Sequence, residues 1–514
     1  MEVHSCRYQE IKRKGDMKSI KKTAISMIMF AVMGMTTVHA ASPAPKYVFV
    51  FVGDGMSYPQ IQSAAYYTGK DAGGIVDVVK KSENPGDSPK MKALSFYDFP
   101  VAGSASTYDA TSFAPDSAST ATSIFTGYKT HSSSINVDIT KKIKYRTIAE
   151  QLRDQKKWKI GVISTVNLNH ATPAATYAHQ ASRKSNYPIG LELVESNFDY
   201  FAGGALMEPQ DKKKDKKSIY DLAKDAGYKV CFDQNAAGSL KNGDKALVIA
   251  ETLADADSMS YDNDRKTGEW ALRDYVRKGI EVLDNRTGFF MMVEGGKVDW
   301  ACHANDARSS IADTLALSEA VEEAIAFYKK HPKETLILVT ADHETGGLTI
   351  GYAGTDYNLF FRTLDSQKIS YAKFDSDYVA AYKKNGTSFE AVMKDVEKLF
   401  GLKLPGSNGS NKNGGLVLTG YELGKIKTAY EKTIKNDKSR NQMEYDIYGT
   451  YEPLTITITH VLNAKCGLGW TSNSHTGLPV PVFALGAGQE EFKGFYDNTE
   501  IYKKMAKLVK VVKD

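Results

Sequence analysis

Asp299 and His303 are the clearest candidates for chemistry, because they lie four residues apart in the chain. In a helical turn this spacing places both side chains on one face, where a carboxylate and an imidazole can chelate one metal ion. Asp342 and His343 are adjacent and can bind a second ion. Asp54 can bridge between ions, since a carboxylate has two oxygens. The residue types therefore predict a site with more than one metal ion.

His475 precedes the apolar run 480–485 and can complete a coordination shell. Taken singly, each of these residues has an ordinary structural alternative. An aspartate after a strand can cap a helix, and a buried histidine can simply hydrogen-bond in the core. The recurrence of metal-type ligands at the ends of several apolar runs favours metal binding over these alternatives.

Three apolar runs must position the ligands. The runs and the residues that follow or end them are 46–52 with Asp54, 288–293 with Glu294, and 335–340 with Asp342 and His343. Buried parallel strands have such β-branched and aromatic sequences, and open α/β sheets bind ligands beyond the carboxyl ends of their strands. We therefore expect these side chains to converge at one edge of a sheet.

Ser117 is the candidate nucleophile. It lies in a run of small and hydroxylic residues, 116–123, that continues to Gly127. Asp116 or Ser117 can open a helix here and the glycine can end it. The free N–H groups and positive dipole end of such a helix favour a phosphoryl group carried by Ser117. On this segment alone, an ordinary serine cap remains the alternative.

The rest of the chain predicts an α/β fold with a large, mostly parallel central sheet and helices on both faces. Further strand-like runs occur at 158–165, 228–232, 246–250 and 480–485, and a helix is predicted over 307–331. Between 352 and 461 the sequence becomes rich in Tyr, Lys and Asn, with low complexity at 405–415. We expect this region to form an inserted surface subdomain with a flexible loop.

Residues 1–40 have the layout of a secretory signal peptide, with Met17 as the expected start. Three lysines precede an apolar stretch, 24–35, that is too short to span a bilayer, and small residues surround Ala40. We expect export to the periplasm or the medium, and one catalytic domain over 41–514. The leader carries +4 of the formal net charge of +5, so the remaining chain gives no electrostatic case for nucleic acid as a partner.

Several standard motifs are absent. Gly53-Asp54-Gly55 resembles the start of a dinucleotide fingerprint, but Tyr58 stands where the third glycine belongs. The sequence has no Walker loop and no Gly-x-Ser-x-Gly elbow, which removes support for NAD, ATP and serine-hydrolase chemistry. After the leader, only three cysteines remain, so at most one intrachain bridge can form.

The candidate residues are similar to the motifs of the alkaline phosphatase family and occur in that family's order. The resemblance covers about 46–350 and 470–490 and rests on Val52-Gly53-Asp54-Gly55-Met56, Asp116-Ser117-Ala118-Ser119, His170-Ala171-Thr172-Pro173-Ala174, Ser182-Arg183-Lys184, Val293-Glu294-Gly295-Gly296, Asp299 with His303, Thr340-Ala341-Asp342-His343-Glu344 and His475-Thr476-Gly477. It implies hydrolysis of phosphate monoesters through a phosphoserine at Ser117. The region 352–461 lies outside the match and looks like the long surface insertion of some bacterial members.

The resemblance also implies two Zn²⁺ and one Mg²⁺ per subunit. The ligand sets that it implies are Asp299, His303 and His475 for one zinc; Asp54, Asp342 and His343 for the zinc that faces Ser117; and Asp54, Thr172 and Glu294 for magnesium, with His170 close by. Arg183 would hold the phosphate. His170 and Trp300, which are also expected to contact substrate or its phosphate, depart from one well-known bacterial pattern, which has Asp and Lys there.

Two alternatives to a phosphomonoesterase remain open at this point. A phosphodiesterase or sulfatase could use the same metal ligands, although Arg183 and the sequence around Ser117 favour monoesters. A secreted zinc-binding protein without catalysis could also keep the ligands, but it would need neither Ser117 nor Arg183. The resemblance further implies a homodimer, with no membrane span once the leader is removed.

Overall fold

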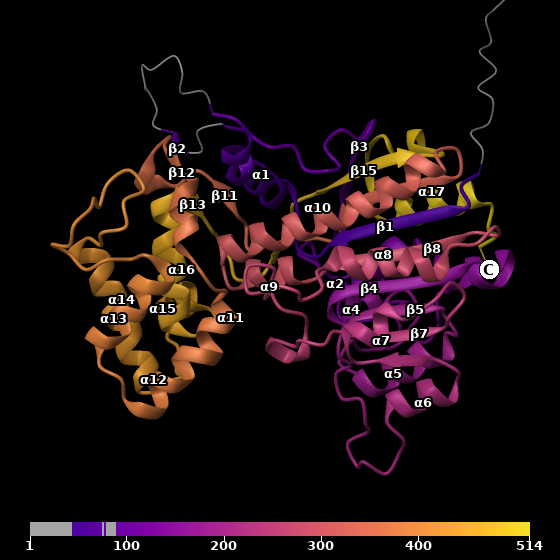
Figure 1. The fold of residues 1–514 in the computed structure, drawn as a ribbon, viewed down its shortest axis with the longest axis horizontal. Helices are drawn as coiled ribbons and strands as arrows, with labels where there is room; N and C mark the ends of the chain where they lie inside the picture. The colour runs from indigo at the N-terminus through magenta and orange to yellow at the C-terminus, as the bar shows by residue number, and fades with distance from the viewer. Residues whose placement is uncertain (1–43, 74–76, 79–88, 514) are drawn as a thin grey trace, which may run out of the picture. The chain divides into compact units, whose positions relative to one another are not determined.

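A ten-stranded sheet organises the chain in the computed structural model (Figure 1), in the order β16-β3-β15-β9-β1-β8-β4-β5-β7-β6. The strands are β1 Tyr47–Gly53, β3 Val101–Ser106, β4 Lys159–Asn167, β5 Tyr200–Gly204, β6 Lys229–Cys231, β7 Ala246–Ile249, β8 Phe289–Gly295, β9 Thr335–Ala341, β15 Val480–Gly486 and β16 Gly494–Asp497. Neighbouring strands are parallel except at β15, which runs antiparallel to both β9 and β3. The predicted mostly parallel sheet is confirmed.

The structure describes residues 44–73, 77–78 and 89–513. The predicted leader, 1–40, lies outside this range. Among the described residues, none of the helices combines the length and the apolar character that crossing a membrane requires. Cys231, Cys302 and Cys466 are all buried and free, so no disulfide links the described part of the chain.

Strands β1, β8 and β9 form the centre of the sheet, and every one of their residues is buried. Because successive side chains of a strand point to opposite faces, complete burial means that both faces of the sheet are covered. The register pairs Gly53 of β1 with Gly295 of β8 and with Ala341 of β9. The three strands therefore end level with one another, and the residues after them emerge at the same edge.

Helices cover this sheet in two packed groups. The helices that carry or surround the site are α1 Tyr58–Tyr67, α2 Ser117–Thr126, α3 Ile148–Gln151, α4 Ala171–Ala174, α5 Asn186–Glu195, α6 Ile219–Asp225, α7 Gln234–Gly238, α8 Leu272–Leu283, α9 Lys297–His303, α10 Ala307–Lys330 and α17 Thr499–Val509. The long helix α10 packs on β1, β8 and β9 and contacts α1, α8 and α9, while α2 packs with α3, α4 and α17. The bounds of α10 confirm the helix predicted over 307–331.

The region 352–461 is mostly helical, which its Tyr-, Lys- and Asn-rich composition did not reveal. Its elements are β12 Leu359–Phe360, α11 Tyr371–Phe374, α12 Ala380–Asn385, α13 Phe389–Phe400, α14 Gly420–Ile434, α15 Gln442–Tyr448 and α16 Pro453–Cys466, the last of which continues past residue 461. β12 pairs with β2 Asp77–Val78, and short ladders join β10 Glu344–Thr345 to β14 His475–Thr476 and β11 Thr349–Ile350 to β13 Leu468–Gly469. Buried residues of this region, such as Phe374 and Phe400, belong to the same hydrophobic cluster as the central strands.

Candidate active site

The level ends of β1, β8 and β9 bring three carboxylates together. Asp54, Glu294 and Asp342 are all buried. Burial and the neighbouring Asp342 and Asp299 raise the pKa of Asp54, and burial raises the pKa of Glu294 to about 7. Buried carboxylates that repel one another in this way need positive charge nearby. The sheet edge therefore has the electrostatics of a cation site, as the sequence predicted.

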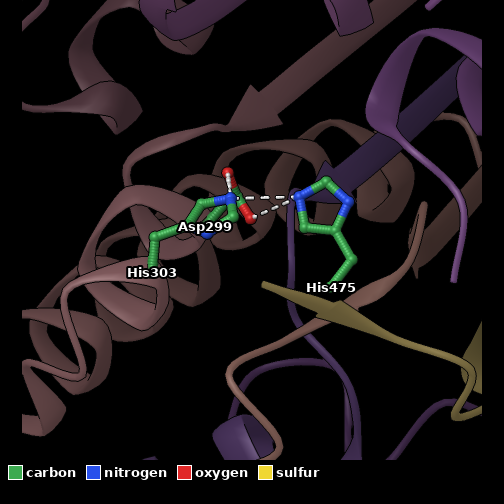
Figure 2. Close-up of side chains that lie close together, drawn as sticks. All are labelled: Asp299, His303 and His475. Carbon is green, nitrogen blue, oxygen red and sulfur yellow. Dashed lines mark hydrogen bonds and ion pairs between the residues drawn. The ribbon is translucent and has the colours of Figure 1, made fainter. Parts of the chain in front are cut away.

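A first candidate metal group consists of Asp299, His303 and His475 (Figure 2). Asp299 and His303 come from one face of helix α9, as their spacing predicted, and His475 reaches in from β14. The Nε2 atom of His303 lies 3.3 Å from Asp299 Oδ2, and Nε2 of His475 lies 3.6 Å from Oδ1. Burial opposes ionisation of Asp299, yet the three surrounding histidines hold its pKa well below its usual range.

The Nδ1 atoms of His303 and His475 already make hydrogen bonds. His303 Nδ1 lies 2.6 Å from the carbonyl oxygen of Asn473, and His475 Nδ1 lies 2.6 Å from that of Pro115. A carbonyl oxygen only accepts, so each Nδ1 carries a hydrogen and donates it. In the neutral imidazoles the two Nε2 lone pairs then face each other across 3.0 Å, which is repulsive unless a proton or a metal ion lies between them.

A second candidate group, Asp54, Asp299 and His343, surrounds Ser117. His343 Nε2 is 3.4 Å from Asp54 Oδ1, and the Ser117 hydroxyl oxygen is 3.1 Å from His343 Nε2 and 3.5 Å from Asp54 Oδ1. Asp342, predicted as a ligand here, places its Oδ2 atom 3.4 Å from His343 Nε2. Asp299 belongs to both groups, so the two groups are contiguous.

The third candidate group is Asp54, His170 and Glu294. Thr172 adds a hydroxyl 3.3 Å from Asp54 Oδ2, and the Ser164 hydroxyl donates to Glu294 Oε2. Glu294 Oε1 and His170 Nδ1 are buried, and neither has a hydrogen-bond partner among the residues that the structure describes. The orphaned Oε1 atom of Glu294 is one that a bound cation would satisfy. His170 Nδ1 is not, because Nε2 of the same ring accepts from Arg183 and Nδ1 therefore carries the ring hydrogen.

Ser117 is the first residue of helix α2, and the structure confirms the predicted start and end of that helix. Asp116 is the N-cap and accepts a hydrogen bond from the Ser119 backbone N–H, while Gly127 ends the helix at a φ of 72°. The Asp116 side chain also accepts from Arg183 Nη1 at 2.9 Å. Burial opposes its ionisation, but Arg183 and three hydrogen-bond donors lower the pKa of Asp116 to about 2. The guanidinium is thereby held beside the serine.

His170 and Trp300, the predicted substrate contacts, lie together next to Arg183. Arg183 Nη2 is 3.0 Å from His170 Nε2, and the ring of Trp300 meets that of His170 edge-on at 5.9 Å. Burial lowers the pKa of His170 to about 3, so its ring is neutral and can accept from the guanidinium. The structure thus brings every predicted site residue into one connected cluster.

Sequence reasoning missed Thr345 and Asn473. The Thr345 hydroxyl donates to Asp299 Oδ1 and lies 3.3 Å from His343 Nδ1, so it contacts one ligand of each zinc-type group. Asn473 orients His303 through its backbone carbonyl. The only sequence signal for Thr345 was its position two residues after His343, which places both on one side of an extended segment.

Comparisons with known proteins agree with this fold. The model of the family described as alkaline phosphatase matches residues 45–511. Alkaline phosphatase 4 of Bacillus subtilis (strain 168) is 30% identical over 475 residues, which span 91% of this chain and 89% of the relative. The cold-active alkaline phosphatase of Shewanella sp. aligns with a TM-score of 0.70 and 27% identity, over 90% of this chain and 99% of that one. The alkaline phosphatase of Thermus thermophilus shares the fold, with a TM-score of 0.72 at 20% identity over 94% of this chain and 96% of that one.

The match of the family model over nearly the whole described chain makes this protein an enzyme of the phosphatase class. The chain belongs to the alkaline phosphatase family, whose members depend on metal ions.

Proposed function

We propose that this enzyme hydrolyses phosphate monoesters with Ser117 as the nucleophile. The observation that supports this most directly is the position of the Ser117 hydroxyl, 3.1 Å from His343 Nε2 inside the second ligand group. A serine hydroxyl is a weak nucleophile until it is deprotonated, and a site rich in metal ligands offers a way to activate it without a histidine base.

The donor sets fit two Zn²⁺ and one Mg²⁺ per subunit. Nitrogen and carboxylate donors suit zinc, and we assign one ion to Asp299, His303 and His475. We assign the other to Asp54, Asp342 and His343, because Nε2 of His343 lies 3.4 Å from an oxygen of each carboxylate. The third set, of Asp54, Thr172 and Glu294, offers mainly oxygen donors, which suit magnesium. When bound, the zinc ions would lower the pKa of the serine hydroxyl and stabilise charge on the attacking and leaving oxygens.

The chain's own groups account for binding and attack. Ser117 begins helix α2, whose first backbone N–H groups can donate to phosphate oxygens. Arg183 contacts Asp116 through Nη1 and His170 through Nη2, and each of these nitrogens keeps a second hydrogen that can donate to a non-bridging phosphate oxygen. The bond from Ser117 Oγ to phosphorus forms as the ester P–O bond breaks, and the alcohol leaves with the proton that the serine gives up. Water then attacks the phosphoserine, which releases inorganic phosphate and restores the hydroxyl.

The decisive test replaces Ser117 by Ala and measures kcat/KM for an aryl phosphate together with bound zinc and magnesium. We expect kcat/KM to fall at least about a thousandfold while the metal content stays normal, because the covalent step is lost. Ser123→Ala is the matched control: this residue is buried in the same helix, but its hydroxyl only bonds the Ser119 carbonyl. Undiminished phosphate release by Ser117→Ala would refute the mechanism.

The presence of Arg183 favours a monoesterase over a phosphodiesterase or a sulfatase with the same metal ligands. Two guanidinium donors match a phosphoryl group with several free oxygens, and a diester has fewer of them to offer. Comparing turnover of aryl phosphate, bis-aryl phosphate and aryl sulfate separates these activities. A zinc-binding protein without catalysis would hydrolyse none of them.

We also propose that the protein is exported to the periplasm or the medium and acts as a homodimer. Export is supported by the lysine, apolar and small-residue order of residues 1–40. The dimer is supported by membership of the family, and 352–461 is the segment we expect to reach toward the partner. N-terminal sequencing of the mature protein and sedimentation at working concentration test the two statements; an intact leader or a monomer would contradict them.

A further inference from the structure

A cavity of about 550 Å³ opens beside His303. One wall is formed by Tyr445 of helix α15 and by Thr450 and Tyr451 of the segment that joins α15 to α16, all in the region 352–461. The other wall is the loop 471–474, which precedes His475. The region that matched no catalytic motif therefore borders the first candidate metal group.

The two walls are in close contact at Gly449. Gly449 has a φ of 54°, and a Cβ there would come within 2.8 Å of the Asn473 side-chain oxygen. Asn473 in turn accepts the Nδ1 hydrogen of His303 at its carbonyl oxygen. The segment between α15 and α16 is thus packed directly on the loop that orients a metal ligand, and this contact fixes the cavity relative to His303.

The cavity lies on the side from which a leaving group would depart. In an in-line displacement the attacking and leaving oxygens are on opposite sides of phosphorus, each next to one of two metal ions. Ser117 lies beside His343 in the second group, so the leaving oxygen belongs next to the first group. His303, which is part of that first group, also lines the cavity.

The lining combines aromatic rings with groups that recognise hydroxyls. Tyr445 is 56% exposed and presents its ring, and Tyr451 is half-buried and meets Tyr371 edge-on at 6.0 Å. Asp446 accepts from Gln442 at 2.8 Å and keeps further acceptor capacity for a vicinal diol, and Thr450 and Ser474 add exposed hydroxyls. A ring for stacking and a carboxylate for a diol are the groups with which proteins recognise a nucleoside.

We propose that this cavity binds the leaving group of the substrate and makes the enzyme prefer a nucleoside 5′-monophosphate to a simple alkyl phosphate. This rests on the proposed monoesterase function, because it concerns which alcohol that reaction releases. The cavity lies within the size range of small-molecule pockets, and an ethyl group would leave its aromatic and polar lining unused.

The test compares kcat/KM for adenosine 5′-monophosphate and ethyl phosphate in the metal-loaded enzyme and two variants. We expect Tyr445→Ala to lower kcat/KM for the nucleotide about tenfold, the size of one base–aromatic stacking contact, and to leave ethyl phosphate within about twofold. Tyr421→Ala is the control, since Tyr421 is a 75% exposed tyrosine of helix α14 that does not line this cavity. Thr450→Trp, whose larger side chain should fill the cavity, should likewise lower kcat/KM for the nucleotide only.

Calorimetric titration with adenosine gives a readout that is independent of turnover. We expect adenosine to bind the metal-loaded enzyme and to bind Tyr445→Ala about tenfold more weakly, with Tyr421→Ala unchanged. Three results would overturn the proposed subsite: equal losses of kcat/KM for both substrates in Tyr445→Ala, no loss of kcat/KM for the nucleotide in that variant, or no detectable adenosine binding to the parent enzyme. Failure of the parent enzyme to hydrolyse either ester would instead overturn the proposed function.

Discussion

The edge of the sheet and the region 352–461 use burial for opposite purposes. At the sheet edge, burial raises the pKa of Asp54, Glu294 and Asp342, so keeping these carboxylates charged requires a cation nearby. In the region 352–461, helices such as α13 bury apolar residues and leave polar ones in water. The buried carboxyl groups at the sheet edge lower the stability of the fold but can bind cations. The apolar packing in the region 352–461 stabilises the fold and places one wall of the cavity beside the site. Under the two proposals above, reactivity would reside at the edge of the sheet and selectivity in the inserted helices.

Removing Asp299 should give the largest effect, because it is the residue that the first two candidate metal groups share. We expect Asp299→Ala to lose bound zinc and to lower kcat/KM at least about a thousandfold for every monoester, since both sides of the displacement lose support. Metal analysis and kinetics measure this. Asp377→Asn, an exposed position in the region 352–461, is the control and should change neither quantity. Full zinc content with full activity in Asp299→Ala would break the division between the two regions.

Arg183→Ala should have the next largest effect. We expect kcat/KM for aryl phosphate to fall about a hundredfold, because two charge-assisted donors to the phosphate are lost. Turnover of bis-aryl phosphate should fall less, since a diester has fewer free oxygens for the guanidinium. Steady-state kinetics on both substrates tests this. Arg183→Lys keeps the charge but not the planar fork and should recover only part of the loss; equal losses on both esters would contradict the assigned role.

Substitution of Asp375 should have the smallest effect, because this residue lies outside the site and its substitution changes only stability. Burial raises its pKa to about 7 between helices α11 and α12, where it accepts a hydrogen bond from Thr455. In the unfolded chain this carboxyl has a pKa of about 3.9, so folding binds a proton between these values. The stability that the neutral form provides is complete below about pH 4 and is lost as the pH rises through 7.

We therefore expect Asp375→Asn to stabilise the enzyme at pH 8 by on the order of 3 kcal/mol and to have little effect at pH 4. Thermal or denaturant unfolding at the two pH values measures the difference, and turnover of ethyl phosphate should be unchanged. Asp377→Asn serves again as the exposed control. A gain that is equal at both pH values would show that titration of this carboxyl is not its source.

Sequence predicted the central fold well because burial on both faces leaves a clear pattern. The runs at 46–52, 288–293 and 335–340 correspond to β1, β8 and β9 within two residues at each end. β3 and β5 were missed for a physical reason: β3 is built of small residues, Val-Ala-Gly-Ser-Ala-Ser, and β5 ends in two glycines. Only Val101 in β3, and only Tyr200 and Phe201 in β5, are of the β-branched or aromatic type that identifies a strand, so the place of both strands in the sheet depends on neighbouring strands.

The site was predictable to the extent that its chemistry resides in charged and imidazole side chains. Asp299 and His303 could be paired from their spacing, and the three strand ends could be expected to converge. Thr345 could not be found, because a hydroxyl has no distinctive pattern and gains its role only from lying next to Asp299 Oδ1. The cavity was equally hidden, since Gly449 and Asn473 meet only through tertiary packing.

The register of β1 has a practical consequence for anyone who produces this enzyme. β1 is paired along its whole length with both β8 and β9. If it slipped by a single residue, alternate side chains would swap faces and Asp54 would leave all of its partners at once. Such a molecule could keep most of its secondary structure and still bind no metal ions, so metal content per chain is a stricter gauge of correct assembly than circular dichroism.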